Sequence, residues 1–196
     1  MNARAVRPGA APPGFVRIVG GRFKRTKLPV PALPGLRPTP DRVRETLFNW
    51  LGAQLDGWRC LDAFAGTGAL GLEAASRGAV EVILIERERR VAEGLEAIAR
   101  RLNADVVRVV RDDAIAWMSR AETGRFDVVF LDPPFESGLV EPALAAALPL
   151  VAVDGSVYVE SPRPVDPPPG WIAHRRGHAG AVHFALLRRE PSAGPG

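Results

Sequence analysis

The stretch FDVVFLDPPF, residues 126–135, is an apolar run that ends in the tetrapeptide Asp132-Pro133-Pro134-Phe135. Mostly β-branched and aromatic residues fill the run up to Leu131, so it predicts a buried strand. An isolated Asp-Pro-Pro is usually only a turn. Its meaning therefore depends on which residues end the other strands of the chain.

Strands and helices alternate around this stretch, from Trp58 to near the C-terminus, which is typical of a mostly parallel sheet with helices on both faces. Besides 126–132, strands are predicted at 59–64, 80–86, 106–110 and 156–161, with a late strand, expected to be antiparallel, at 181–189. Helices are predicted at 69–77, 91–102, 114–120 and 139–148. The predicted fold class is α/β.

Acidic residues stand at the ends of the first three predicted strands, namely Asp62, Glu86 and Asp113. In an open α/β sheet, ligands bind outside the carboxyl ends of the strands, where the strand order reverses. Because Asp132 ends the fourth strand, four acids are expected at one ligand-binding edge. The glycine turn GTGALG, residues 66–71, follows the first strand, and its small residues let backbone amides approach a ligand closely.

This glycine turn also satisfies the dinucleotide fingerprint GxGxxG, with an acid about 20 residues further on, so an NAD-dependent oxidoreductase is a rival interpretation. Asp62 precedes the turn, where it would repel a pyrophosphate but can bind the cationic amino group of a methionine moiety. Asp113 can accept a hydrogen bond from an adenine amino group, and Glu86 can accept both ribose hydroxyls. These acids favour S-adenosylmethionine over NAD as the cofactor.

The tetrapeptide at 132–135 predicts methylation of an exocyclic base amine. Such an amine is a poor nucleophile, since its lone pair is delocalised into the ring. A carboxylate from Asp132 and the carbonyl of Pro133 could accept its hydrogens and expose the lone pair, while Pro133 and Pro134 restrict the backbone. Phe135 offers a face on which an extruded base can stack. Transfer by direct displacement would then depend on positioning and electrostatics.

Positive charge is concentrated at the N-terminal end. The first 44 residues carry ten basic side chains and the single acid Asp41, a net charge of +9 against −5 for the remainder. Such an arm suits a polyanion, because neutralised phosphates release counterions, although a solvated tail is the plain alternative. Phe15 and Phe23, interleaved with the basic residues, favour nucleic acid.

Four segments are expected along the chain. Residues 1–14 and 191–196 are rich in Pro, Ala and Gly and are expected to be disordered tails. Residues 15–52 form a basic RNA-binding extension, with a short strand or hairpin around Gly20 and Gly21 and a proline-stiffened connector at 29–40. Residues 53–190 form the catalytic domain.

The extension ends in a predicted helix. Thr39 and Pro40 resemble its cap and first position. Val43, Leu47, Trp50 and Leu51 recur at helical spacing, which leaves Arg42 and Arg44 on other faces.

The composition excludes several classes of protein. Cys60 is the only cysteine, so there is no internal disulfide, and we interpret it as a buried core thiol. Three scattered histidines with one thiol do not make a metal site. No apolar run is long enough to span a membrane, and no signal peptide is evident, so a cytoplasmic location is expected. A monomer is expected because no long apolar helix is left without a core to join. Trp50, Trp58 and Trp117 are expected in or near the core, and Glu160 is interpreted as a polar residue at a strand end.

The sequence resembles the RsmD-type 16S rRNA (guanine-N2)-methyltransferases of bacteria over roughly residues 17–188. The resemblance rests on RIVGG (17–21), LDAFAGTGALGLEAASRGA (61–79), FLDPPF (130–135) and YVES (158–161). The block LRPTPDRVRETLFNWL (36–51) is the part most specific to this family. The last strand departs from the family pattern, because His183-Phe184 stands where relatives often have a tyrosine.

The resemblance implies a class I S-adenosylmethionine-dependent methyltransferase fold, Rossmann-like, with a mostly parallel seven-stranded sheet and an antiparallel late strand. It implies methylation of N2 of one guanine in 16S rRNA, within the small ribosomal subunit or its assembly intermediate. The expected cofactor residues are Asp62, Phe64, Gly66, Gly68, Glu86, Asp113 and Asp132, and the expected catalytic residues are Asp132, Pro133, Pro134 and Phe135. The expected RNA-binding residues are Arg22, Lys24, Arg25, Arg37, Arg42 and Arg44, with Asp41 in the same block.

Three alternatives remain open from the residues themselves. An adenine-N6 methyltransferase acting on DNA or RNA would use the same tetrapeptide chemistry. An NAD-dependent oxidoreductase would use the same glycine turn. A non-catalytic RNA-binding module would keep the fold and the basic arm without transferring a methyl group.

Overall fold

The computed structural model describes residues 14–31 and 39–191. Most of the two predicted tails, and most of the predicted connector at 29–40, lie outside the described residues. Within the described ranges, no helix is long and apolar enough to cross a membrane.

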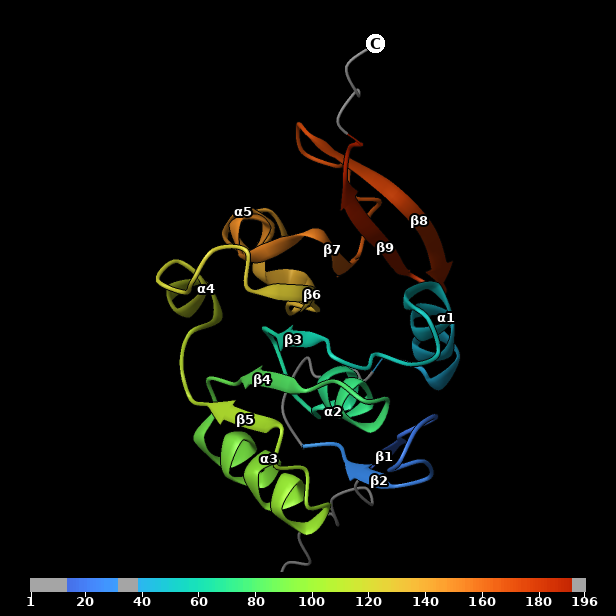
Figure 1. The fold of residues 1–196 in the computed structure, drawn as a ribbon, viewed down its shortest axis with the longest axis vertical. Coiled ribbons are helices and arrows are strands. Elements are labelled where there is room, and N and C mark those ends of the chain that lie inside the picture. The colour runs from blue at the N-terminus through green and yellow to red at the C-terminus, as the bar shows by residue number, and fades with distance from the viewer. Residues whose placement is uncertain (1–13, 32–38, 192–196) are drawn as a thin grey trace, which may run out of the picture.

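A seven-stranded sheet forms the centre of the molecule (Figure 1). Its strands lie in the order β5-β4-β3-β6-β7-β9-β8, where β3, β4, β6 and β7 pair in parallel with one another and β5 pairs in parallel with β4. Strand β9 runs antiparallel to both of its neighbours. The predicted α/β class, with a mostly parallel sheet and an antiparallel late strand, is confirmed. The bounds are β3 Arg59–Asp62, β4 Glu81–Ile85, β5 Val107–Val110, β6 Phe126–Leu131, β7 Val151–Ser161, β8 Trp171–Ala179 and β9 Val182–Arg189.

Helices cover both faces of this sheet because the central strands are apolar on both sides. Along β4, Val82 and Leu84 face one core cluster while Ile83 and Ile85 face the other, as the two-residue period of a strand requires. The first cluster packs against helices α1, α2 and α3, and the second against α4 and α5. The bounds are α1 Asp41–Leu51, α2 Ala69–Ser76, α3 Arg89–Arg101, α4 Ala114–Met118 and α5 Val140–Ala147, with short 3₁₀ turns η1 Phe135–Ser137 and η2 Leu148–Leu150.

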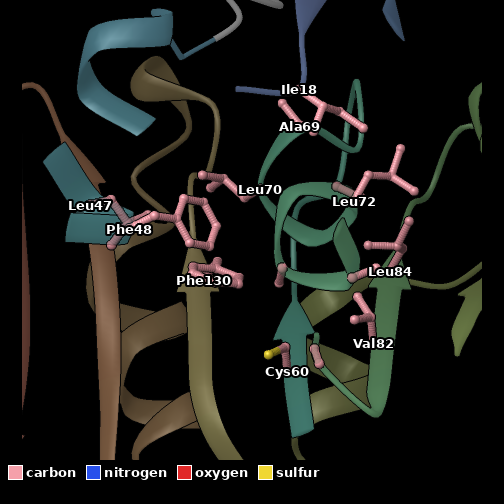
Figure 2. Close-up of a cluster of buried hydrophobic side chains, with 14 of the residues drawn as sticks. Ile18, Leu47, Phe48, Cys60, Ala69, Leu70, Leu72, Val82, Leu84 and Phe130 are labelled. Carbon is pink, nitrogen blue, oxygen red and sulfur yellow. The ribbon is translucent and has the colours of Figure 1, made fainter. Parts of the chain in front are cut away.

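The N-terminal extension shares the first core cluster with the catalytic domain. Strands β1 Phe15–Arg17 and β2 Lys27–Pro29 pair antiparallel and confirm the predicted hairpin. Ile18 of this segment lies beside Ala69 of α2, and Phe48 of α1 packs toward Phe130 of β6 (Figure 2). Hairpin, helix α1 and sheet therefore enclose one continuous core.

Close backbone contact fixes the hairpin on helix α2. The Arg22 backbone amide donates to the Ser76 carbonyl at 2.7 Å, and the Ser76 hydroxyl donates to the Gly20 carbonyl at 2.6 Å. Gly21 has φ +70°, and a Cβ on it would lie 1.8 Å from the Ser76 carbonyl oxygen. Only glycine fits this approach, which explains the second glycine of RIVGG.

Two features of the sheet differ from the sequence prediction. Strand β7 begins at Val151, five residues before the predicted strand at 156–161. Strand β8 was missed, because it lies at the edge of the sheet, where Arg175, Arg176 and His178 are exposed and replace the apolar pattern of a central strand.

The sequence predicted correctly that the cysteine and three of the tryptophans lie in or near the core. Cys60 is fully buried, and burial raises the pKa of its thiol well above the ordinary value, so it is a core residue. Trp50 and Trp58 are partly buried against the first cluster and Trp117 against the second, as predicted.

Candidate active site

The predicted acids do meet at one edge of the sheet. The chain runs from β3 outward through β4 to β5 and then returns to β6 on the other side of β3, so the strand order reverses between β3 and β6. Asp62 is the last residue of β3, and Asp132 directly follows β6. Glu86 follows β4, and Asp113 lies three residues beyond the end of β5. The four carboxyl groups therefore follow four strands around the reversal point, where a ligand is expected.

Asp62 is a buried carboxyl group held by the helix that follows it. Its Oδ2 accepts a 2.9 Å hydrogen bond from the Gly71 backbone amide. Burial raises its pKa to about 7, and the nearby carboxyls of Glu86 and Glu160 add to the shift, while the Gly71 amide opposes it. A cation that approached Asp62 would favour its ionised form and would bind there strongly.

The glycine turn is tied to the end of β4. The Gly66 backbone amide donates to Glu86 Oε2 at 3.0 Å, and the Glu88 amide donates to Glu86 Oε1 at 2.7 Å. Gly68 precedes helix α2 in the left-handed conformation, with φ +74°, and a Cβ there would lie 2.6 Å from Leu95 Cδ2. Phe64, half-buried, lies between Asp62 and this turn. The turn is thus built to bring backbone, rather than side chains, to a ligand.

Asp113 caps helix α4. Its Oδ1 accepts from the Ala116 amide at 2.9 Å, and the residue is exposed. The second carboxylate oxygen is the one that could accept from a ligand.

Asp132 belongs to a cluster of buried polar groups that the sequence did not reveal. The Thr39 hydroxyl oxygen lies 3.2 Å from Asp132 Oδ2 and 2.9 Å from Glu160 Oε1. The Tyr158 hydroxyl donates to the same Glu160 oxygen at 2.9 Å. Burial, followed by the charges of Glu160 and Asp62, raises the pKa of Asp132 well above its ordinary value, and burial also raises that of Glu160.

Thr39 and Glu160 correct two predictions. Thr39 is not the helix cap, because Pro40 stands at that position without a side-chain hydrogen bond and the Thr39 hydroxyl faces the carboxyl groups instead. Glu160 is only 2% exposed and lies in the centre of the cluster, so it is more than a polar residue at a strand end. Strand register supplies the signal: Leu131 pairs with Val159, which places Asp132 beside Glu160.

The tetrapeptide has a defined shape at this edge. Pro133 is buried, Pro134 is exposed, and Phe135 is half-buried at the start of η1. The Ser137 backbone amide donates to the Pro134 carbonyl at 3.1 Å and closes the turn. The aromatic ring of Phe135 is therefore carried on a short ordered turn directly after Asp132.

The predicted RNA-binding residues fall into three groups. Arg22, Lys24 and Arg25 are exposed on the loop between β1 and β2, and Arg42 is exposed on α1. Arg37 lies outside the described residues. The prediction that Arg44 binds RNA is wrong, because its side chain is fully buried and bonds to Asp41 at 2.5 Å and to Glu73 at 3.4 Å.

The two aromatic residues of the N-terminal arm differ in their exposure. Phe15 is 57% exposed, whereas Phe23 is 8% exposed and belongs to the core. Phe23 is therefore unavailable to stack on a base, and only Phe15 keeps that option.

The fold and the edge acids together define a class I methyltransferase. In its sheet, the antiparallel strand β9 lies between β7 and β8. The glycine turn follows β3, and the tetrapeptide Asp-Pro-Pro-Phe follows β6. The family model described as "Conserved hypothetical protein 95" matches residues 16–188. The chain belongs to this family, that of the ribosomal RNA small subunit methyltransferases D.

Individual relatives agree with this assignment. The chain is 43% identical over 189 residues to the ribosomal RNA small subunit methyltransferase D of Escherichia coli K12, covering 94% of this chain and 95% of that protein. It is 37% identical over 182 residues to the enzyme of the same name from Haemophilus influenzae, covering 89% and 94%. A solved structure of the putative methyltransferase yhhF from E. coli has a TM-score of 0.79 and 44% identity, covering 90% of this chain and 99% of that one. This membership decides against the NAD-dependent oxidoreductase.

Proposed function

We propose that this protein transfers a methyl group from S-adenosylmethionine to the exocyclic N2 of a specific guanine in 16S rRNA. The observation that carries the proposal is the position of Asp132-Pro133-Pro134-Phe135 at the reversal point of the sheet, next to the buried carboxyl of Asp62. Relatives named ribosomal RNA small subunit methyltransferase D, 43% identical over 94% of the chain, support the substrate.

The residues at this edge fit S-adenosylmethionine. The buried carboxyl of Asp62 suits a cationic amino group. The two carboxylate oxygens of Glu86 can each accept a hydrogen bond from one hydroxyl of a ribose diol. Asp113 suits the adenine amino group, and the bare backbone of Gly66 and Gly68 leaves space for the ligand beside Phe64. When bound, the cofactor supplies a methyl group on a sulfonium centre.

The tetrapeptide would hold and activate the base. A carboxylate at Asp132 and the carbonyl of Pro133 accept the two hydrogens of the guanine amine, which orients its lone pair toward the methyl group. Stacking on Phe135 replaces the contacts that the base loses when it leaves the RNA fold. Because the site lies in a partly buried setting, these hydrogen bonds are worth more than they would be in water.

The hairpin would supply affinity for the RNA backbone. Arg22, Lys24 and Arg25 sit on one exposed loop, and Arg42 is exposed on the neighbouring helix. Basic side chains of this kind bind phosphates without reading sequence. We assign RNA binding to residues 15–52 and catalysis to 53–190, in a monomer acting on the small subunit or its assembly intermediate in the cytoplasm.

The test is transfer of tritium from labelled S-adenosylmethionine to small ribosomal subunits from a strain that lacks the endogenous enzyme. Nucleoside analysis should find the label in N2-methylguanosine. Naked 16S rRNA and DNA, offered in parallel, separate the substrates. Label in N6-methyladenosine would instead establish the adenine-N6 alternative, and no label with intact cofactor binding would overturn the proposed acceptor.

A further inference from the structure

Methylation of an amine leaves a proton to be removed. As the bond from N2 to the methyl carbon forms and the bond from that carbon to sulfur breaks, N2 becomes cationic and must lose one of its two hydrogens as a proton. A positioned carboxylate is a suitable acceptor, and Asp132 is the acid that contacts the amine in the proposed function. Asp132 must therefore be ionised before the amine is methylated.

The Thr39 hydroxyl lies between two carboxyl groups. Its oxygen is 3.2 Å from Asp132 Oδ2 and 2.9 Å from Glu160 Oε1. A hydroxyl carries one hydrogen and can donate to only one of these oxygens at a time. If both carboxyls were ionised, one of them would face an oxygen lone pair, so the arrangement is satisfied when the pair shares one proton.

The donors around Glu160 give a direction to the hydrogen bonds that link Asp132, Thr39 and Glu160. Both the Tyr158 hydroxyl and the Thr39 hydroxyl lie 2.9 Å from the same oxygen, Oε1, which suits an ionised, accepting carboxylate. Thr39 then donates to Glu160 and presents its lone pairs to Asp132. A proton on Asp132 Oδ2 would be donated to the Thr39 oxygen, which completes a series of hydrogen bonds from Asp132 through Thr39 to Glu160.

The surroundings bury most of this cluster and hold it in place. Thr39 is 5% exposed, Glu160 2% and Tyr158 0%, whereas Asp132 is half-buried. The buried Arg44 donates through Nε to the Thr39 carbonyl at 3.4 Å, which fixes the backbone that carries the hydroxyl. Of the two acids, only Asp132 is partly exposed, so Glu160 acts through Thr39.

We propose that Thr39 and Glu160 form a proton relay that takes the shared proton from Asp132 when the guanine amine binds and so supplies the accepting carboxylate. Asp132 gives its Oδ2 proton to the Thr39 oxygen as the Thr39 hydrogen moves to Glu160 Oε1, which leaves Asp132 ionised. After the methyl transfer, Asp132 takes the proton that the amine loses and releases it from its partly exposed carboxyl group when the product leaves. No oxidant or further reactant is needed. The inference rests on the proposed function, since it requires an amine acceptor at Asp132.

The first test is single-turnover methyl transfer to small subunits across the neutral pH range. Glu160→Gln keeps an acceptor oxygen for Thr39 and Tyr158 but cannot take the proton, so the rate should fall by roughly 10²-fold. Thr39→Val should match it, Thr39→Ser should recover most of the rate, and the double variant Thr39→Val/Glu160→Gln should lose no more than either single one. The matched control Thr123→Val removes an exposed hydroxyl in the turn before β6, at the end of that strand opposite Asp132, and it should leave the rate unchanged.

A merely structural Glu160 would give a different pattern. Its substitution would lower the rate equally at every pH, the losses from Thr39→Val and Glu160→Gln would add, and binding of S-adenosylhomocysteine would weaken with the rate. The relay instead predicts unchanged cofactor affinity and a changed pH profile in Glu160→Gln. Additive losses with an unchanged profile overturn the relay.

A second test needs no acceptor. The infrared band of protonated carboxyl groups should titrate at lower pH in Glu160→Gln than in the wild type, because the Glu160 charge raises the pKa of Asp132. An unchanged titration would show that the two acids share no proton and would overturn the relay. A wild-type protein that transfers no methyl group, yet shows this coupled titration, would overturn the proposed acceptor and leave the shared proton standing.

Discussion

The backbone amide of Val19 donates a 2.7 Å hydrogen bond to Glu73 Oε2, which joins the N-terminal hairpin to helix α2. The other oxygen of Glu73 accepts from the Gly20 amide at 2.7 Å and from Arg77 Nε at 2.8 Å. Arg44 also contacts this carboxylate, which is fully buried. A single side chain on α2 thus joins the hairpin and helix α1 to the sheet domain.

Replacing Glu73 with alanine should destabilise the fold strongly. The change leaves two buried cations and two amides without their acceptor, which costs about 3–5 kcal/mol of unfolding free energy. Urea denaturation measures this loss, and hydrogen exchange should show the hairpin amides losing protection first. Glu96→Ala, which removes a surface pair with Arg100, is the matched control and should cost less than about 1 kcal/mol. Equal losses in the two variants would contradict the buried role of Glu73.

Asp132→Ala should abolish methyl transfer while leaving cofactor affinity near normal. The rate should fall by at least roughly 10²-fold, because the amine loses both its hydrogen-bond acceptor and its proton acceptor. Because burial raises the pKa of Asp132, removing the carboxyl should not weaken folding through loss of charge. Calorimetry with S-adenosylhomocysteine and single-turnover transfer together check the prediction. Loss of cofactor binding would place Asp132 in the cofactor site and overturn the role assigned to it.

Charge reversal of Arg22, Lys24 and Arg25 should weaken RNA binding and flatten its salt dependence. Each phosphate contact contributes about 0.7–0.9 to the slope of log affinity against log salt, so three lost contacts should reduce the slope by about 2–3. Filter binding of 16S rRNA at several salt concentrations measures both effects. Arg101→Glu, on the exposed end of α3, is the control and should change neither. Unchanged binding by the triple variant would return the arm to the role of a solvated tail.

Cofactor affinity should rise with pH through the ionisation of Asp62. Its pKa of about 7 lies above the ordinary value of 3.8, so the folded protein retains this proton between those pH values while the unfolded chain has lost it. The resulting stability is full below about pH 4 and is lost as pH rises through about 7. A cationic amino group binds only the ionised form, so affinity should increase about 10-fold from pH 6 to pH 8, with proton release near pH 7. Asp62→Asn should abolish the pH dependence, and calorimetry in buffers of different ionisation enthalpy would measure the release.

Local patterns were enough to predict the glycine turn and the acids at strand ends. Each of those residues follows an apolar run within its own segment, and the parallel sheet brings such ends together. The contact between Thr39 and Glu160 spans 121 positions, and no local pattern encodes it. The polar edge strand β8 was missed for a related reason, since only pairing with β9 reveals it. Site residues supplied by long-range contacts were therefore the ones that sequence reasoning could not find.

Arg42 and Arg44 show this limit in one helical turn, and they lead to opposite predictions. Both were expected to contact RNA, yet Arg42 is exposed while Arg44 is fully buried between Asp41 and Glu73. Arg42→Ala should weaken RNA binding and leave the unfolding free energy within about 0.5 kcal/mol of the wild type. Arg44→Ala should leave Glu73 with one cation fewer and cost about 3–5 kcal/mol. Because Arg44 also bonds to the Thr39 carbonyl, its loss should lower the methyl-transfer rate even where the protein is still folded. Paired denaturation and RNA-binding measurements test both variants, and an Arg44→Ala protein that is stable but deficient in RNA binding would place this arginine on the RNA surface after all.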